Sequence, residues 1–185
     1  VRKSAPKKPQ KEYLLVDGYN IIFSWEDLKE LAEVNLEAAR GKLMDILCNL
    51  QGYRKNTVIL VFDAYRVEGS KGSVSRYHNI HVVYTKEAET ADQYIEKTAH
   101  ELGRQYEVTV ATSDALEQVI ILGQGARRMS AQGLLEEVRN VNAEIRDSFL
   151  SQYTGSKQYL LENLPEELAK FMEEVRLGRK SFGED

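Results

Sequence analysis

Short apolar runs without polar alternation are the feature that most constrains the fold of this chain. A strand of this kind must be buried on both faces, as in the middle of a parallel sheet. Two such runs lie at Tyr13–Asp17 and Thr57–Asp63, and further strands are predicted at Ile80–Thr85 and Glu107–Thr112. Segments with helical spacing of apolar residues separate them, at Asp27–Leu50, Thr90–Gln105 and from Ser113-Asp114 to about Leu122. The alternation predicts an α/β fold, a parallel sheet flanked by helices.

The remaining segments complete this prediction. We expect Ala64–Asn79, which is rich in glycine and serine, to form a mobile loop. A short edge strand is expected at Ala126–Ser130 and a long amphipathic helix at Ala131–Leu150. Beyond Leu150 we expect Gly155 to act as a breaker and Pro165 to open a short helix, Glu166–Leu177. The predicted organisation is a basic disordered arm at 1–11, one globular domain at 12–150 and a C-terminal extension at 151–185.

Charge is distributed unevenly along the 185 residues. The net charge is −4, and the first eleven residues carry five basic side chains and no acidic one, which leaves the rest of the chain at −9. An acidic body suits a protein that gathers carboxylates around a cation, and it does not suit general binding of duplex nucleic acid. The arm is either a solvated tail or a contact for phosphates.

Two absences in the sequence bear on location. Cys48 is the only cysteine, so no disulfide can form within the chain and nothing indicates an oxidising compartment. No apolar run approaches the roughly 18 residues that a membrane-spanning helix needs. We therefore expect a cytoplasmic protein that does not enter membranes.

Acidic residues fall where the predicted strands end. They are Asp17, Asp63, Glu89, Asp92 and Asp114. In an open parallel sheet, ligands bind outside the carboxyl ends of the strands, so these side chains are expected on one rim. Carboxylates brought together repel unless a cation neutralises them, and oxygen ligands without a cysteine or histidine cluster favour Mg²⁺ or Mn²⁺. Such an ion supports hydrolysis of phosphodiesters.

Each of these residues also has an ordinary structural interpretation. Asp114 can cap a helix together with Glu117, and the Thr90–Gln93 capping box would place Asp92 in a first helical turn. Asp63 can bond the backbone of its own turn, and Glu89 can be a solvated side chain. Asn20, three residues after Asp17, can hold a phosphate or a metal-bound water, or serve as a turn residue.

Four segments resemble a known family in the expected order. Val16–Asn20 resembles the signature of NYN-domain ribonucleases, relatives of the PIN-domain nucleases, and the other three resemble motifs of the YacP-like subfamily: Phe62–Tyr65, Tyr84–Asp92 and Thr112–Asp114. The resemblance implies a three-layer PIN-like fold, a magnesium site and RNA cleavage. It makes Asp17, Asp92 and Asp114 metal ligands, with Asn20, Asp63 and Glu89 in support. It also implies association with the ribosome and cleavage of mRNA there.

Basic and aromatic residues alternate in the loop expected after the second strand. Arg66, Lys71 and Arg76, with Lys86 near the same rim, are candidates for holding RNA phosphates, while Tyr65 and Tyr77 could stack on bases. We predict that this segment clamps single-stranded RNA or docks ribosomal RNA; the alternative is an ordinary solvated loop.

The sequence therefore predicts a magnesium-dependent endoribonuclease. The alternative is an RNA- or ribosome-binding module whose acids do not support turnover. An aspartyl phosphatase is discounted because Tyr19 stands where such enzymes usually have a second aspartate, and a P-loop nucleotidase because the Gly-x-x-x-x-Gly-Lys-Ser/Thr motif is absent.

Overall fold

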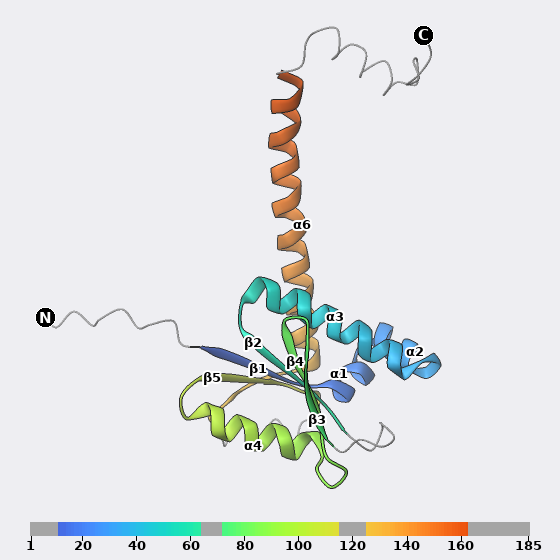
Figure 1. Ribbon diagram of the computed structural model, residues 1–185. Coiled ribbons are helices and arrows are strands. Elements are labelled where there is room, and N and C mark those ends of the chain that lie inside the picture. Colours follow the sequence, from blue (N-terminus) through green and yellow to red (C-terminus); the bar gives the residue numbers. More distant parts are fainter. Residues whose placement is uncertain (1–10, 64–71, 115–124, 163–185) are drawn as a thin grey trace, which may run out of the picture. The chain divides into compact units, whose positions relative to one another are not determined.

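The computed structural model describes residues 11–63, 72–114 and 125–162, with side chains as far as Ser151. It divides into two compact units, Val1–Val141 and Asn142–Asp185. The first unit carries the sheet (Figure 1), and its residue range includes every acidic residue singled out by the sequence. Arg66, Lys71, the helix expected after Asp114 and the one expected at Glu166–Leu177 lie outside the described residues.

A single sheet forms the centre of the first unit. Its strands are β1 (Glu12–Asp17), β2 (Thr57–Phe62), β3 (Ser73–Tyr77), β4 (Ile80–Tyr84), β5 (Glu107–Ala111) and β6 (Arg127–Met129). They lie in the order β3-β4-β2-β1-β5-β6, and every neighbouring pair is parallel except β3 with β4. The predicted parallel sheet is confirmed. The chain builds outward from β1 first to one side and then to the other, so the order reverses at the end of β1, where α/β proteins bind ligands.

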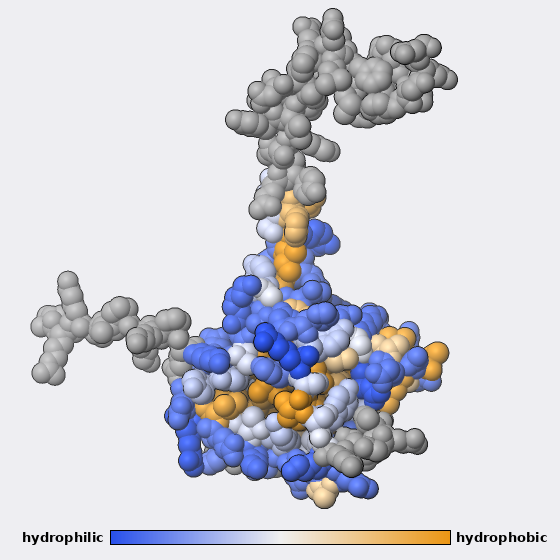
Figure 2. Space-filling model, viewed as in Figure 1, coloured by the Kyte–Doolittle hydropathy of each residue, from blue (hydrophilic) through white to orange (hydrophobic). Residues whose placement is uncertain are grey.

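Helices cover both faces of the sheet (Figure 1). The helices of the described residues are α1 (Gly18–Ser24), α2 (Glu26–Val34), α3 (Leu36–Arg54), α4 (Ala91–Gly103) and α6 (Ala131–Glu162), and the main contacts with the sheet come from α1, α3 and α4. On one face, Ile95 and Ala99 of α4 pack with Leu15 and Val61 in a fully buried cluster. Helices α1 and α3 contact the sheet from its other face, where Leu43 of α3 is fully buried. Hydrophilic side chains cover most of the outer surface of this unit in the view of Figure 2. The three-layer arrangement predicted from the sequence is confirmed.

A buried hydrogen bond joins two distant parts of the chain. The indole N–H of buried Trp25, between α1 and α2, donates to the carbonyl oxygen of Ala131 at 2.9 Å. Ala131 is the first residue of α6, so this hydrogen bond spans 106 positions in the sequence. A buried Trp normally finds such a partner for its N–H.

The prediction of one continuous helix over Asp27–Leu50 is wrong, because Asn35 divides this segment into α2 and α3. Asn35 ends α2 and begins α3 in an extended conformation, φ −154° and ψ 101°. Its backbone N–H donates to Leu31, and its side-chain oxygen accepts the N–H of Ala38 at 3.0 Å. Asn is among the best N-cap residues, so the break follows from local chemistry. The sequence analysis also missed α1, although an aspartate before Gly18 is itself an N-cap signal.

The prediction of a loop over Ala64–Asn79 is wrong for its last part, because Ser73–Tyr77 forms the strand β3. This strand pairs antiparallel with β4 through a two-residue turn of His78 and Asn79. His78 has φ 48°, which a two-residue hairpin of this kind requires. The usual Asn-Gly signal is absent from the turn, and the strand is mostly exposed, so it lacked the apolar run by which the other strands were predicted.

Gly155 does not break a helix as expected, because α6 continues through it to Glu162. A glycine within a helix costs only about 1 kcal/mol relative to alanine, which a long helix tolerates. The short edge strand expected at Ala126–Ser130 is confirmed as β6. None of the helices in the described ranges is long and apolar enough to cross a membrane.

Candidate active site

The turn after β1 fixes the first acidic side chain. Asp17 is the last residue of β1 and the N-cap of α1, and its Oδ1 accepts the backbone N–H of Asn20 at 3.1 Å. It is only 5% exposed. A Cβ on Gly18 would overlap the ring of Phe62, so the close approach of this turn to β2 requires glycine. The local sequence therefore buries a carboxylate at the carboxyl end of β1, a central strand of the sheet.

The start of α4 brings two further carboxylates to the same edge. Thr90 caps α4 through the predicted capping box with Gln93, which places Asp92 in the first turn. Asp63, directly after β2, accepts the backbone N–H of Ala91 at 2.7 Å. One oxygen of Asp63 thus anchors the helix start to the end of the neighbouring strand.

Asn20, in the first turn of α1, connects this helix with the segment after β5. Its Oδ1 accepts the backbone N–H of Ser113 at 3.0 Å and also the Ser113 hydroxyl. Asp114 follows, with its backbone N–H donating to the hydroxyl of buried Thr112 at 3.1 Å. Asn20 therefore determines where the segment bearing Asp114 lies. The sequence analysis did not give Ser113 a role, although it lies beside Asp114 in the Thr112–Asp114 segment that resembles a family motif.

The four aspartates share one electrostatic environment. Burial raises the pKa of Asp17 to about 7, and the negative charges of Asp92 and Asp63 add to the rise, while the hydrogen bonds from Asn20 lower it. The pKa of Asp92 is raised by burial of its carboxyl and by the charges of Asp63 and Asp114, against a hydrogen bond with Asp17 that lowers it. Side chains from the ends of separate strands thus act on one another.

Glu89 lies in the turn between β4 and α4. It is half-buried, and its backbone N–H donates to the carbonyl oxygen of Lys86 at 2.9 Å. Its supporting role in the site stays a prediction.

The donor set suits a hard divalent cation. All four side chains offer carboxylate oxygen, and a cation would offset both the burial and the mutual repulsion that raise the pKa values of Asp17 and Asp92. Within residues 11–63, 72–114 and 125–162, no group of three or more Asp, Glu, His or Cys is arranged to hold a metal ion. Mg²⁺ usually keeps several waters and takes only one or two protein carboxylates, so the pair Asp17 and Asp92 fits a hydrated ion of this type.

Two of the predicted RNA-binding residues, Lys86 and Arg76, lie toward opposite ends of the strands. Lys86 is exposed just after β4, on the edge that carries the acids. Arg76 lies on β3 opposite His81, near the start of β4 and therefore toward the other end of the strands, and its Nε donates to the His78 carbonyl oxygen at 3.0 Å. The structure thus brings Lys86 but not Arg76 to the acidic edge, and RNA binding by either residue stays a prediction.

Comparison with known proteins establishes the family. A family model described as the YacP-like NYN domain matches residues 14–177. The chain belongs to this family. YacP of Bacillus subtilis (strain 168) is 42% identical over 168 residues, which cover 90% of this chain and 98% of YacP. The chain also resembles the crystal structure of Rae1 (YacP) from Bacillus subtilis, with a TM-score of 0.66 and 42% identity over 90% of this chain and 95% of that one.

A second structure gives the same result. The W164L mutant of Rae1 (YacP) from Bacillus subtilis has a TM-score of 0.66 and 36% identity, covering 89% of this chain and 99% of that one. The predicted membership of the YacP-like NYN family and the PIN-like α/β fold are therefore confirmed. NYN domains are generally nucleases, so the family gives this chain a nuclease-type function related to RNA.

Proposed function

We propose that this chain is a divalent-metal-dependent endoribonuclease that hydrolyses internal phosphodiester bonds of RNA. The observation that carries the proposal is the shared environment of four carboxylates from separate strand ends, in which burial and neighbouring charges raise the pKa of Asp17 to about 7. Such an arrangement is costly for folding alone and is typical of sites built for a cation or for chemistry.

Each residue has a distinct part in this proposal. Asp17 and Asp92 would hold Mg²⁺ or Mn²⁺ directly, and Asp114 would be a third ligand acting through a bound water. The ion would polarise a phosphoryl oxygen and make a bound water more acidic. Asp63 keeps the first turn of α4 against β2 through the Ala91 N–H. Asn20 keeps the segment with Asp114 beside β1 through Ser113. The site lies where the strand order reverses, on the sheet edge that also exposes Lys86.

The substrate we propose is mRNA engaged with the ribosome, in the cytoplasm. The support for this finer assignment is the resemblance of four motifs to the YacP-like subfamily. Lys86 and the basic residues of the segment after β2 are the proposed phosphate contacts.

Cleavage of labelled RNA tests the proposal. A structured mRNA fragment is incubated with the protein, with and without ribosomes, in Mg²⁺ or in chelator. We expect internal cleavage only with Mg²⁺, and a loss of orders of magnitude for Asp17→Asn and Asp114→Asn, because the charge of a ligand positions the ion. Glu101→Gln is the matched control, since it removes one exposed charge from α4 at the end opposite Asp92. Wild-type cleavage by Asp17→Asn would contradict the assigned role.

One observation favours a second candidate, a non-catalytic RNA-binding module. No three-ligand metal group is formed within the described residues. The same experiment separates the two functions: RNA binding without any Mg²⁺-dependent product, on or off ribosomes, would favour the binding module.

A further inference from the structure

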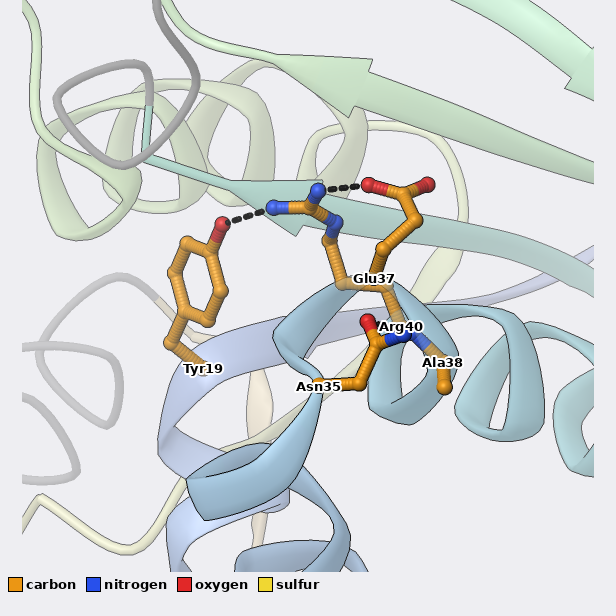
Figure 3. Close-up of polar contacts among 5 residues, drawn as sticks. All are labelled: Tyr19, Asn35, Glu37, Ala38 and Arg40. Carbon is orange, nitrogen blue, oxygen red and sulfur yellow. Dashed lines mark hydrogen bonds and ion pairs between the residues drawn. The ribbon is translucent and has the colours of Figure 1, made fainter.

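Arg40 is a buried cation whose hydrogen bonding is incomplete. It lies in the second turn of α3 and is 8% exposed. Its Nη1 donates to the hydroxyl of Tyr19 at 2.9 Å, and its Nη2 is paired with the carboxylate of Glu37 (Figure 3). The Nε is buried and makes no hydrogen bond within the described residues. Buried polar groups are satisfied in the great majority of cases, so this unused donor indicates a missing acceptor.

The charge of Arg40 is also only weakly compensated. The side chain of Glu37 is 71% exposed, whereas that of Arg40 is 9% exposed. An ion pair with one solvated partner contributes little, and removing a guanidinium from water costs much more. Burying Arg40 with only a solvated partner therefore lowers the stability of the fold. A role in binding an anion explains this buried guanidinium better than a role in stabilising the fold does.

Arg40 is placed beside the candidate active site. Arg54, at the end of α3, lines a hollow with Glu12 and Glu107, the first residues of β1 and β5. The other end of α3 therefore lies toward the edge where the strands finish. Tyr19, which Arg40 contacts, follows Asp17 by two residues, and the guanidinium also lies close enough to Tyr84, the last residue of β4, to lower its pKa against the effect of burial.

The geometry of the guanidinium defines the ligand. Tyr19 holds Nη1, which leaves the edge formed by Nε and Nη2, and Glu37 engages only Nη2 of that edge. A phosphate oxygen pair can accept from both nitrogens at once, which is the strong bidentate mode of arginine. The N-terminus of α3, a 19-residue helix, adds a favourable dipole for an anion there.

We propose that Arg40 binds a backbone phosphodiester of RNA adjacent to the bond that is cut, and that Glu37 occupies this position until RNA displaces it. The inference rests on the proposed endoribonuclease function, because it supplies a second phosphate contact for the same substrate. Glu37 is exposed and can swing into solvent, whereas Arg40 stays fixed by Tyr19. RNA and Glu37 therefore compete for one cation.

Binding measured in chelator tests this competition without cleavage. Fluorescence anisotropy is recorded with a labelled single-stranded RNA that has a 5′-hydroxyl, at several salt concentrations. We expect Glu37→Gln to bind several-fold more tightly than wild type, because the competing charge is removed. Glu33→Gln on α2 is the matched control, since it removes one exposed charge nearby without touching Arg40. Arg40→Gln should bind more weakly and lower the slope of log K against log salt by about one.

The outcomes separate this site from the proposed function. Equal affinities for Glu37→Gln and Glu33→Gln, with RNA binding intact, overturn the phosphate site alone. This comparison holds even if Arg40→Gln fails to fold, because Glu37 is exposed. Repetition with 5′-phosphorylated RNA should leave the effects unchanged, and an effect seen only with that RNA would overturn the assignment to a backbone phosphodiester. Failure of the wild-type protein to bind RNA in chelator would overturn this site, because Arg40 needs no metal, whereas the proposed function is judged by Mg²⁺-dependent cleavage.

Discussion

Replacing Asp17 with asparagine should make the metal-free protein more stable at neutral pH while removing its activity. Asp17 is buried and charged at high pH, and burial raises its pKa from 3.8 to about 7. Each pKa unit is worth about 1.4 kcal/mol, so the rise bounds the gain in free energy of unfolding at roughly 4 kcal/mol above pH 8. Asparagine keeps the oxygen that accepts the Asn20 N–H, so the cap of α1 survives.

The sign of the pH dependence follows from the raised pKa. The proton on Asp17 stabilises the wild-type fold fully below the unfolded-state pKa of 3.8, and this contribution is lost as pH rises to about 7. The advantage of Asp17→Asn should therefore be near zero at about pH 4, roughly 2 kcal/mol at about pH 5 and complete above about pH 8.

Thermal and urea unfolding in chelator measure the effect. At pH 8 the variant should melt up to about 10 °C higher than wild type, a shift expected for a chain of this size. Excess Mg²⁺ should stabilise the wild type and affect the variant less, since a ligand stabilises only the state that binds it. Asp27→Asn, an exposed acid on α2, is the control and should change stability by less than about 0.5 kcal/mol. A variant less stable than wild type at pH 8, or an advantage equal at pH 5 and pH 8, would refute the desolvation argument.

Substitutions at three further positions test how the site is assembled. Gly18→Ala should destabilise the protein by about 1–3 kcal/mol in urea unfolding, because its Cβ would overlap Phe62; unchanged stability would show that the ring can move aside. Asn20→Ala should lower RNA cleavage by about 10–100-fold, with the fold kept by circular dichroism, since the Ser113 segment loses its anchor; full activity would contradict that positioning role. Asp63→Ala should cost about 1 kcal/mol and Asp63→Asn much less, because asparagine still accepts the first backbone N–H of α4; equal losses in thermal unfolding would contradict this.

The sheet could be predicted because its central strands carry their own signal. Val58, Leu60 and Val61 are buried together in one short run, and only a strand covered on both faces explains such a run. β3 gave no such signal, since it is an exposed edge strand whose existence depends on pairing with β4. The break at Asn35 could have been found from capping chemistry, which outweighs helical periodicity at one residue.

The acidic edge could be predicted in outline for a topological reason. Parallel strands deliver their carboxyl ends to one side, so the aspartates that follow them meet without any knowledge of loops. The contact of Asn20 with Ser113 could not be predicted, because it depends on the register of β1 against β5, in which Val16 lies opposite Ala111. Arg40 could not be predicted either, since Glu37 and Arg40 three residues apart on a helix look like an ordinary exposed pair.

The hydrogen bond from Trp25 to Ala131 bears on when the protein can become active. Ribosomes make proteins from the N-terminus, and a domain folds as a unit once its parts have been made. Every aspartate of the acidic edge precedes residue 131, yet Trp25, at the end of α1, can make its hydrogen bond to the first residue of α6 only after that residue has emerged. A nascent chain that already contains all four aspartates therefore still lacks one contact of the finished fold, and we expect the acidic edge to be complete only after the start of α6 has been made.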